Sequence, residues 1–106
     1  MYYFAYGSNL NRKQMLERCP DSKPKFVAIL PNYKLIFAGW SRKWRGGIAT
    51  IKRLRGEKVL GAVYDISEQC LRHLDRYEEG YAKLKVTVFD EDGEPVEAIT
   101  ISSLGN

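Results

Sequence analysis

Residues 26–38 are Phe26-Val27-Ala28-Ile29-Leu30-Pro31-Asn32-Tyr33-Lys34-Leu35-Ile36-Phe37-Ala38, and this stretch decides the expected fold. Two runs rich in β-branched and aromatic residues flank Pro31-Asn32, a dipeptide that is typical of a turn. The stretch therefore predicts a hairpin with strands at 26–30 and 33–38. A second hairpin is expected from residues 47–51 and 59–64, which flank a basic turn containing Gly56.

Shorter elements are expected on both sides of the two hairpins. Gly7-Ser8-Asn9 interrupts an aromatic run, Ser67 is a good helix cap, and Gly80 is a good helix stop. The expected elements are a strand at 2–6, a helix at 11–18, a helix from Ser67 to about Glu79, and strands at 84–88 and 96–101 joined by a turn at 91–94. Strands dominate, so the predicted fold class is α+β, a small, curved, mixed β-barrel-like sheet with flanking short helices.

Length and composition favour one small domain. The chain has 106 residues, of which 44% are apolar and 28% are charged, so we expect a single domain over residues 1–106 with one site. The longest apolar runs, 26–30 and 59–64, are far shorter than the roughly 18 residues that a membrane-spanning helix needs. Because the first residues also lack the pattern of a secretory signal, we expect a cytoplasmic protein with no membrane partner.

The cysteine and histidine content argues against a metal centre. Cys19 and Cys70 are the two cysteines and His73 is the single histidine, with no spacing that is typical of a zinc site. In a cytoplasmic protein we expect the two cysteines to be reduced, inert thiols. We expect His73 to be an ordinary helix residue, and no metal or cofactor.

Charge is distributed unevenly along the sequence. Residues 1–58 hold 13 basic and 3 acidic residues, a net charge of +10, whereas residues 59–106 hold 4 and 10, a net charge of −6. The densest basic stretch, residues 42–55, has six cations and no acid, and basic stretches with aromatic residues can bind phosphate backbones. We favour a solvated hairpin and do not expect a nucleic-acid partner, but a basic nucleic-acid-binding domain stays as one alternative.

Residues 6–10, Tyr6-Gly7-Ser8-Asn9-Leu10, join the first strand to the first helix. Backbone N–H groups that converge at the start of a helix can hold a carboxylate or an oxyanion. Ser8 is not expected to be a nucleophile, because the sequence lacks a Gly-x-Ser-x-Gly motif and the histidine lies in a different helix. The loop alone is also consistent with ordinary turn and capping chemistry.

Two glutamates end the second helix. At about 100° per residue, the apolar positions Cys70, Leu71, Leu74 and Tyr77 form one stripe, with Glu78 about 50° from its centre and Glu79 about 150° away. Glu78 is therefore expected to face inward and Glu79 to face water. Because desolvation disfavours a charged carboxylate, burial would raise the pKa of Glu78 toward the range useful for proton transfer.

Four motifs in this order resemble the γ-glutamylcyclotransferase-like, or AIG2-like, family. They are Phe4-Ala5-Tyr6-Gly7-Ser8-Asn9-Leu10, Gly46-Gly47-Ile48-Ala49-Thr50-Ile51, Leu60-Gly61-Ala62-Val63-Tyr64 and Leu74-Asp75-Arg76-Tyr77-Glu78. The resemblance implies a small mixed β-barrel and a cofactor-independent enzyme of the acyltransferase or lyase type. In such an enzyme the α-amine of a γ-glutamyl amide attacks its own γ-carbonyl, which releases 5-oxoproline and an amine.

The resemblance also implies roles for individual residues. Glu78, the fifth residue of the Leu-Asp-x-x-Glu motif, corresponds to the catalytic glutamate, and the alternative is Glu79, because an extra glutamate precedes the glycine. Substrate-binding residues would be Tyr6, Gly7, Ser8, Asn9, Leu10 and the following tyrosine, Tyr81. A non-catalytic small-ligand-binding module on the same fold stays open, as does a homodimer in which a second subunit completes the pocket.

Overall fold

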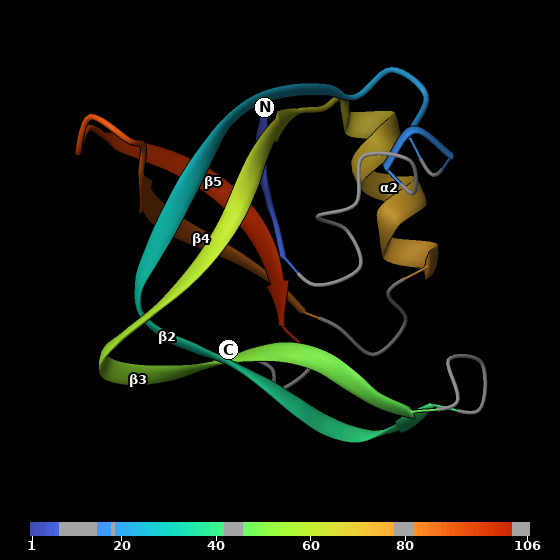
Figure 1. Ribbon diagram of the computed structural model, residues 1–106. Helices are drawn as coiled ribbons and strands as arrows, with labels where there is room; N and C mark the ends of the chain where they lie inside the picture. The colour runs from blue at the N-terminus through green and yellow to red at the C-terminus, as the bar shows by residue number, and fades with distance from the viewer. Residues whose placement is uncertain (7–14, 18, 42–45, 78–81, 103–106) are drawn as a thin grey trace.

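The computed structural model describes residues 1–6, 15–17, 19–41, 46–77 and 82–102, and within these residues five strands form a sheet beside the helix α2 (Figure 1). Residues 15–17 are also helical, within the expected helix at 11–18. The elements in chain order are β1 (Tyr2–Ala5), β2 (Lys23–Ser41), β3 (Gly46–Asp65), α2 (Glu68–Tyr77), β4 (Ala82–Phe89) and β5 (Pro95–Ser102).

The strands close into a barrel in the order β1-β3-β2-β4-β5. β1 pairs with β5 in parallel at Tyr3 and Ile99, and the other neighbouring strands pair antiparallel. The predicted α+β class with a small mixed barrel is therefore confirmed.

The prediction of two separate hairpins from residues 26–64 is wrong. β2 and β3 are each continuous and pair with one another along one long ribbon, from Lys23 opposite Asp65 to Ser41 opposite Gly46. The register shifts between Pro31, opposite Lys58, and Tyr33, opposite Arg53, so that β3 carries three more residues than β2 at this point.

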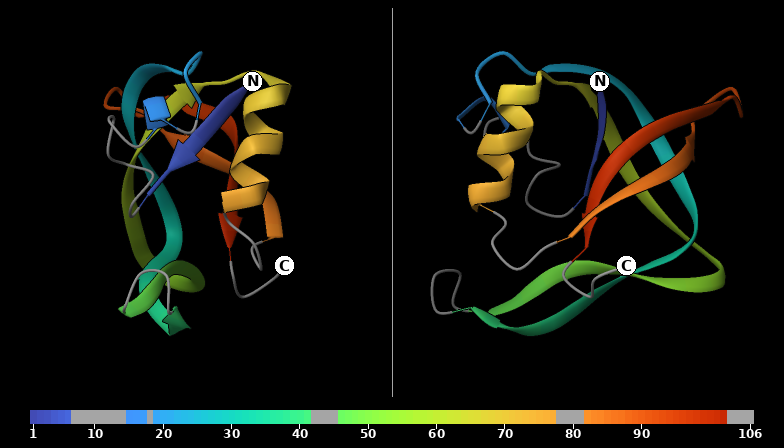
Figure 2. Two further views of the ribbon diagram at one scale, coloured as in Figure 1. Left: turned by 90° about the vertical axis from the view of Figure 1, so that its right-hand side faces the viewer. Right: turned by 180° about the vertical axis from the view of Figure 1, so that it is seen from behind.

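Two residues with positive φ explain why the expected turns bend the ribbon and do not reverse the chain. Asn32 has a φ of 63° and Gly56 a φ of 88°, and the Gly56 amide donates a hydrogen bond of 3.2 Å to Oδ1 of Asn32. The turn-forming residues of both strands thus lie side by side in one irregularity. Beyond it the ribbon leaves the barrel wall as an arm, which we define as residues 33–41 of β2 and 46–53 of β3 (Figures 1 and 2).

The barrel interior is an apolar cluster to which all five strands contribute. Its buried members are Phe4, Tyr6, Ala28, Leu30, Ile51, Val59, Val63, Val86, Val88 and Ala98. A Cβ atom added at Gly61 would lie 2.5 Å from the Ala5 carbonyl oxygen and 2.6 Å from Cζ of Phe4. Glycine is therefore required here, because the backbone and the Phe4 ring of the neighbouring strand β1 occupy the space that a side chain would need.

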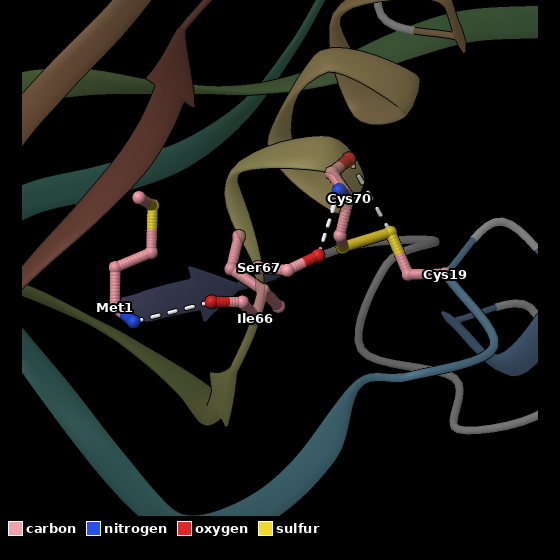
Figure 3. The surroundings of a disulfide bond; sticks show 5 residues. All are labelled: Met1, Cys19, Ile66, Ser67 and Cys70. Carbon is pink, nitrogen blue, oxygen red and sulfur yellow. Dashed lines mark hydrogen bonds between the residues drawn. A yellow bond between two sulfur atoms is a disulfide. The ribbon is translucent and has the colours of Figure 1, made fainter.

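A second apolar cluster lies outside the barrel, under α2 and the helical residues 15–17 (Figure 2). It consists of Tyr3, Ala5, Met15, Cys19, Tyr64, Ile66, Cys70 and Ile101. The cap predicted at the start of α2 is confirmed, since the Cys70 amide donates a hydrogen bond of 3.1 Å to Oγ of Ser67. Nearby, the Met1 amino group donates to the Ile66 carbonyl oxygen at 3.1 Å (Figure 3).

The expectation of reduced thiols is wrong. Cys19 and Cys70, which are 0% and 2% exposed, form a disulfide across 51 positions of sequence (Figure 3). Sγ of Cys19 also lies 3.4 Å from the Cys70 carbonyl oxygen, which is a packing contact, because a disulfide sulfur has no hydrogen to donate. Sequence separation alone could not show that the fold stacks the two cysteines in the cluster beneath α2.

Candidate functional site

Strand directions bring the two halves of the predicted site to one end of the barrel. β1 runs parallel to β5, so both strands finish at the same end. β4 runs antiparallel to β5, and its first residue, Ala82, pairs with Ser102 at the end of β5. The chain therefore leaves β1 after Ala5 and enters β4 at Ala82 at this same end, which we call the site end of the barrel (Figure 1).

Tyr6 is the one predicted site residue that the structure describes. It is 6% exposed, belongs to the interior cluster, and its hydroxyl donates a hydrogen bond to the Ile101 carbonyl oxygen. The side chain thus ties the end of β1 to the end of β5. Tyr6 therefore links β1 to β5 at the site end, immediately before the predicted substrate loop.

The other predicted site residues lie outside the described residues. They are the catalytic candidates Glu78 and Glu79 and the substrate-binding candidates Gly7, Ser8, Asn9, Leu10 and Tyr81. Their assignments therefore stay predictions. The described residues fix where the flanking chain lies: α2 reaches Tyr77, one residue before Glu78, and β4 begins at Ala82, one residue after Tyr81.

Sequence reasoning missed three buried hydroxyl groups at the site end. Oγ of Ser102 donates to the Ile51 carbonyl oxygen at 3.1 Å and lies 3.4 Å from Oγ1 of Thr50, while Oγ1 of Thr100 donates to the Phe4 carbonyl oxygen at 2.9 Å. These bonds join β5 to β3 and to β1. The predicted strand at 96–101 assigns no role to these hydroxyl groups, and no local pattern distinguishes them from other strand residues.

The described part of the basic stretch at 42–55 begins in the arm, with residues 46–53, and ends at Arg55 in the bend of the ribbon. Its described cations, Lys52, Arg53 and Arg55, are exposed, and Arg42, Lys43 and Arg45 lie outside the described residues. Lys34 lies directly opposite Lys52, so two exposed cations share one cross-strand position. The expected solvation of these cations agrees with their exposure, although they lie on one long ribbon and not on a separate hairpin.

The described part of the chain also has a concave surface near the start of β1. An open groove of about 580 Å³ lies beside the start of β1 and the middle of β4 and β5, with Met1, Lys85 and Glu97 in its lining. Tyr6, the one candidate site residue that the structure describes, is not part of this lining. Within residues 1–6, 15–17, 19–41, 46–77 and 82–102, no three His, Cys, Asp or Glu side chains gather as metal ligands would. In the same ranges no helix has the length and hydropathy needed to cross a membrane.

Comparison with known proteins relates the chain to one family. The family described as gamma-glutamyl cyclotransferase, AIG2-like, matches residues 3–101. The gamma-glutamylcyclotransferases of Bos taurus and Homo sapiens are 37% and 36% identical to the chain over 103 residues, each alignment covering 89% of this chain and 54% of the relative. A solved structure titled gamma-glutamyl cyclotransferase superposes with a TM-score of 0.91 at 32% identity, covering 96% of this chain and 65% of that one.

The family match covers almost all of this chain. The matched region begins in β1, ends in β5 and includes every strand of the barrel, so the resemblance inferred from the four motifs is confirmed. The chain spans about half the length of the curated relatives that it matches.

Proposed function

Because this chain belongs to the gamma-glutamyl cyclotransferase, AIG2-like family, we propose that it converts a γ-glutamyl amide into 5-oxoproline and a free amine. The observation that carries the proposal is the family match from residue 3 to residue 101, together with the 37% identity to a named gamma-glutamylcyclotransferase. The α-amine of the substrate forms a new C–N bond with its own γ-carbonyl carbon. The γ-amide C–N bond then breaks, and the proton lost by the attacking amine ends on the leaving amine.

The proposed division of roles needs one carboxylate and one loop. Glu78 accepts the proton from the attacking ammonium group and returns it to the leaving amine, with Glu79 as the alternative base. Backbone amides of Gly7, Ser8 and Asn9 stabilise the negative charge that develops on the γ-carbonyl oxygen. Because the ring closure is intramolecular, the protein must chiefly hold the substrate in a folded conformation.

Leu10 and Tyr81 complete the proposed substrate contacts, and the topology supports this arrangement. Tyr6 precedes the loop and Ala82 follows Tyr81, and both flanking residues lie at the site end of the barrel. Segments that are far apart in sequence thus start from one end of one barrel. The pairing of β5 with both β1 and β4 would hold the loop after Tyr6 and the chain before Ala82 in a fixed relation.

The test is direct detection of 5-oxoproline by mass spectrometry. The purified protein is incubated with a panel of γ-glutamyl amines that includes γ-glutamyl amino acids, glutathione and γ-glutamyl-lysine. Release of 5-oxoproline together with an equal amount of amine from at least one member supports the proposal. Binding of these compounds without any release would favour the non-catalytic ligand-binding module, and neither binding nor release would contradict both.

Three further statements accompany the proposed activity. We propose that residues 1–106 form one domain and that the protein works in the cytoplasm. The Cys19–Cys70 disulfide bears on the proposed location. Structural disulfides are rare in the reducing cytoplasm of most organisms, and the intracellular proteins of hyperthermophiles are the known exception. The third statement is a homodimer in which a second subunit completes the pocket.

A further inference from the structure

The arm exposes large apolar side chains beside the site end of the barrel. Phe37 is 73% exposed and Leu35 is 39% exposed. Single apolar residues on a surface need no explanation, but these two extend an apolar surface that begins inside the barrel.

Strand pairing fixes which face of the arm these side chains occupy. Leu35 pairs with Ile51, and partners in an antiparallel ladder project to the same side of the sheet. Ile51 is 1% exposed and belongs to the barrel interior, together with Tyr6. Phe37, two residues beyond Leu35 on the same strand, projects to this side as well. Both exposed side chains thus lie on the face of the arm that continues the barrel interior.

The arm meets the site end of the barrel at Ile51. The Ile51 carbonyl oxygen accepts the hydrogen bond from Ser102, the last residue of β5, and Ser102 pairs with Ala82, the first residue of β4. Figures 1 and 2 show the arm passing beyond this end of the barrel, below the end of α2. Leu35 and Phe37 lie on the same side of the arm as Ile51, beside and beyond the residue at which the arm meets the site end.

We propose that Leu35 and Phe37 contact the amine portion of the substrate and favour γ-glutamyl amides whose released amine carries a large apolar or aromatic side chain. This inference rests on the proposed function. The glutamyl portion is the same in every substrate and must reach the base and the amide loop. The amine portion is the part that varies, and it projects away from the reacting carbonyl. An aromatic side chain on that portion gains from leaving water and from ring contact with Phe37.

The test compares two substrates that differ only in the side chain of the amine, γ-glutamyl-phenylalanine and γ-glutamyl-alanine. Release of 5-oxoproline from each is followed with wild type and with Phe37→Ala, and kcat/KM is compared between the four combinations. Wild type is expected to prefer the phenylalanine amide. Phe37→Ala should lower kcat/KM for that amide by about tenfold, mainly by raising KM. The kcat/KM for the alanine amide should change by less than about twofold.

Leu60→Ala is the matched control. Leu60 is 64% exposed on the same ribbon, but it pairs with Ile29 in the barrel wall, away from the arm. It should leave both substrates unchanged, and Phe37→Tyr, which keeps the ring, should retain the preference. Thermal unfolding of each variant establishes that the fold is intact.

Several results would overturn the inference. An equal loss of kcat/KM for both substrates would mean that Phe37 stabilises the arm and does not contact the amine portion. Equal kcat/KM of wild type for the two substrates would contradict the proposed specificity. A change in oligomeric state of Phe37→Ala at assay concentration, seen by analytical ultracentrifugation, would assign the face to a second copy of the chain. If wild type releases 5-oxoproline from no amide, the proposed function itself fails, and this inference falls with it.

Discussion

At the residue scale, the choice between Glu78 and Glu79 can be decided by removing one negative charge at a time. Glu78→Gln keeps size and polarity but cannot take a proton, so 5-oxoproline release should fall by about two orders of magnitude or more while binding persists. Glu79→Gln, expected on the solvent side of the helix, should change either quantity little. The measurement is steady-state kinetics, with direct binding by calorimetry. If Glu79→Gln is the inactive variant, the base is one residue further along the chain.

A second residue-scale prediction concerns Gly61 in β3. Its missing side chain makes room for the Ala5 carbonyl oxygen and the ring of Phe4, because an added Cβ would meet them at 2.5 Å and 2.6 Å. Gly61→Ala must shift β1 or the ring, so the free energy of unfolding should fall by about 1–3 kcal/mol. Leu60→Ala, at the exposed neighbouring position, should stay within about 0.5 kcal/mol of wild type in the same urea titration. Equal effects would contradict the close approach of β1.

At the element scale, the sequence correctly located the backbone irregularities in β2 and β3, but the predicted pairing of the strands was wrong. Pro31-Asn32 and Gly56 do mark backbone irregularities, as positive φ values at Asn32 and Gly56 show. Periodicity could not reveal that the two irregularities face one another, because that depends on the pairing of strands that lie far apart in sequence. One bent ribbon and two hairpins have the same local pattern.

The site shows the same division between local and long-range information. The spacing of apolar residues predicted which face of α2 is buried. Cys70 on this face is buried, and Leu71 packs against the apolar cluster outside the barrel. The hydroxyl groups of Thr50, Thr100 and Ser102 carried no local signal of their own. Their role depends on three strands meeting at the site end, and only the barrel topology shows this.

The disulfide leads to a prediction about stability at the scale of elements. It joins α2 to the segment that follows residues 15–17 and closes a loop across 51 positions. In the chain-entropy account, a loop of this size contributes about 4 kcal/mol by restricting the unfolded chain. The double variant Cys19→Ala, Cys70→Ala should lose about that amount in a denaturant titration.

Reduction provides the matched control for the double variant. Dithiothreitol should lower the unfolding midpoint of wild type toward that of the variant and leave the variant unchanged. Two titratable thiols in the untreated, unfolded wild-type protein would contradict the disulfide.

At the scale of the whole molecule, one group of exposed cations and one group of acids lie in different regions. The exposed cations Lys52, Arg53 and Arg55 follow one another along β3, where it enters and leaves the bend of the ribbon. The turn between β4 and β5 is acidic, and Oδ1 of Asp90 accepts hydrogen bonds from the amides of Asp92 and Glu94, both at 2.9 Å. Figure 1 places this turn on the opposite side of the barrel from the arm. A basic surface with this layout attracts polyanions without reading their sequence.

Nucleic-acid affinity, where it is detected, should therefore be purely electrostatic. Replacing Lys52, Arg53 and Arg55 by alanine should weaken binding to two unrelated labelled oligonucleotides equally and lower the salt slope, log K against log salt, by about 2 to 3. Fluorescence anisotropy across a salt series measures both, with Lys85→Ala, an exposed cation of β4, as the control. The reason is that each phosphate contact releases condensed counterions regardless of the base it carries. Sequence-selective binding that survives physiological salt would require contacts to bases, and it would favour the nucleic-acid-binding alternative over an enzyme.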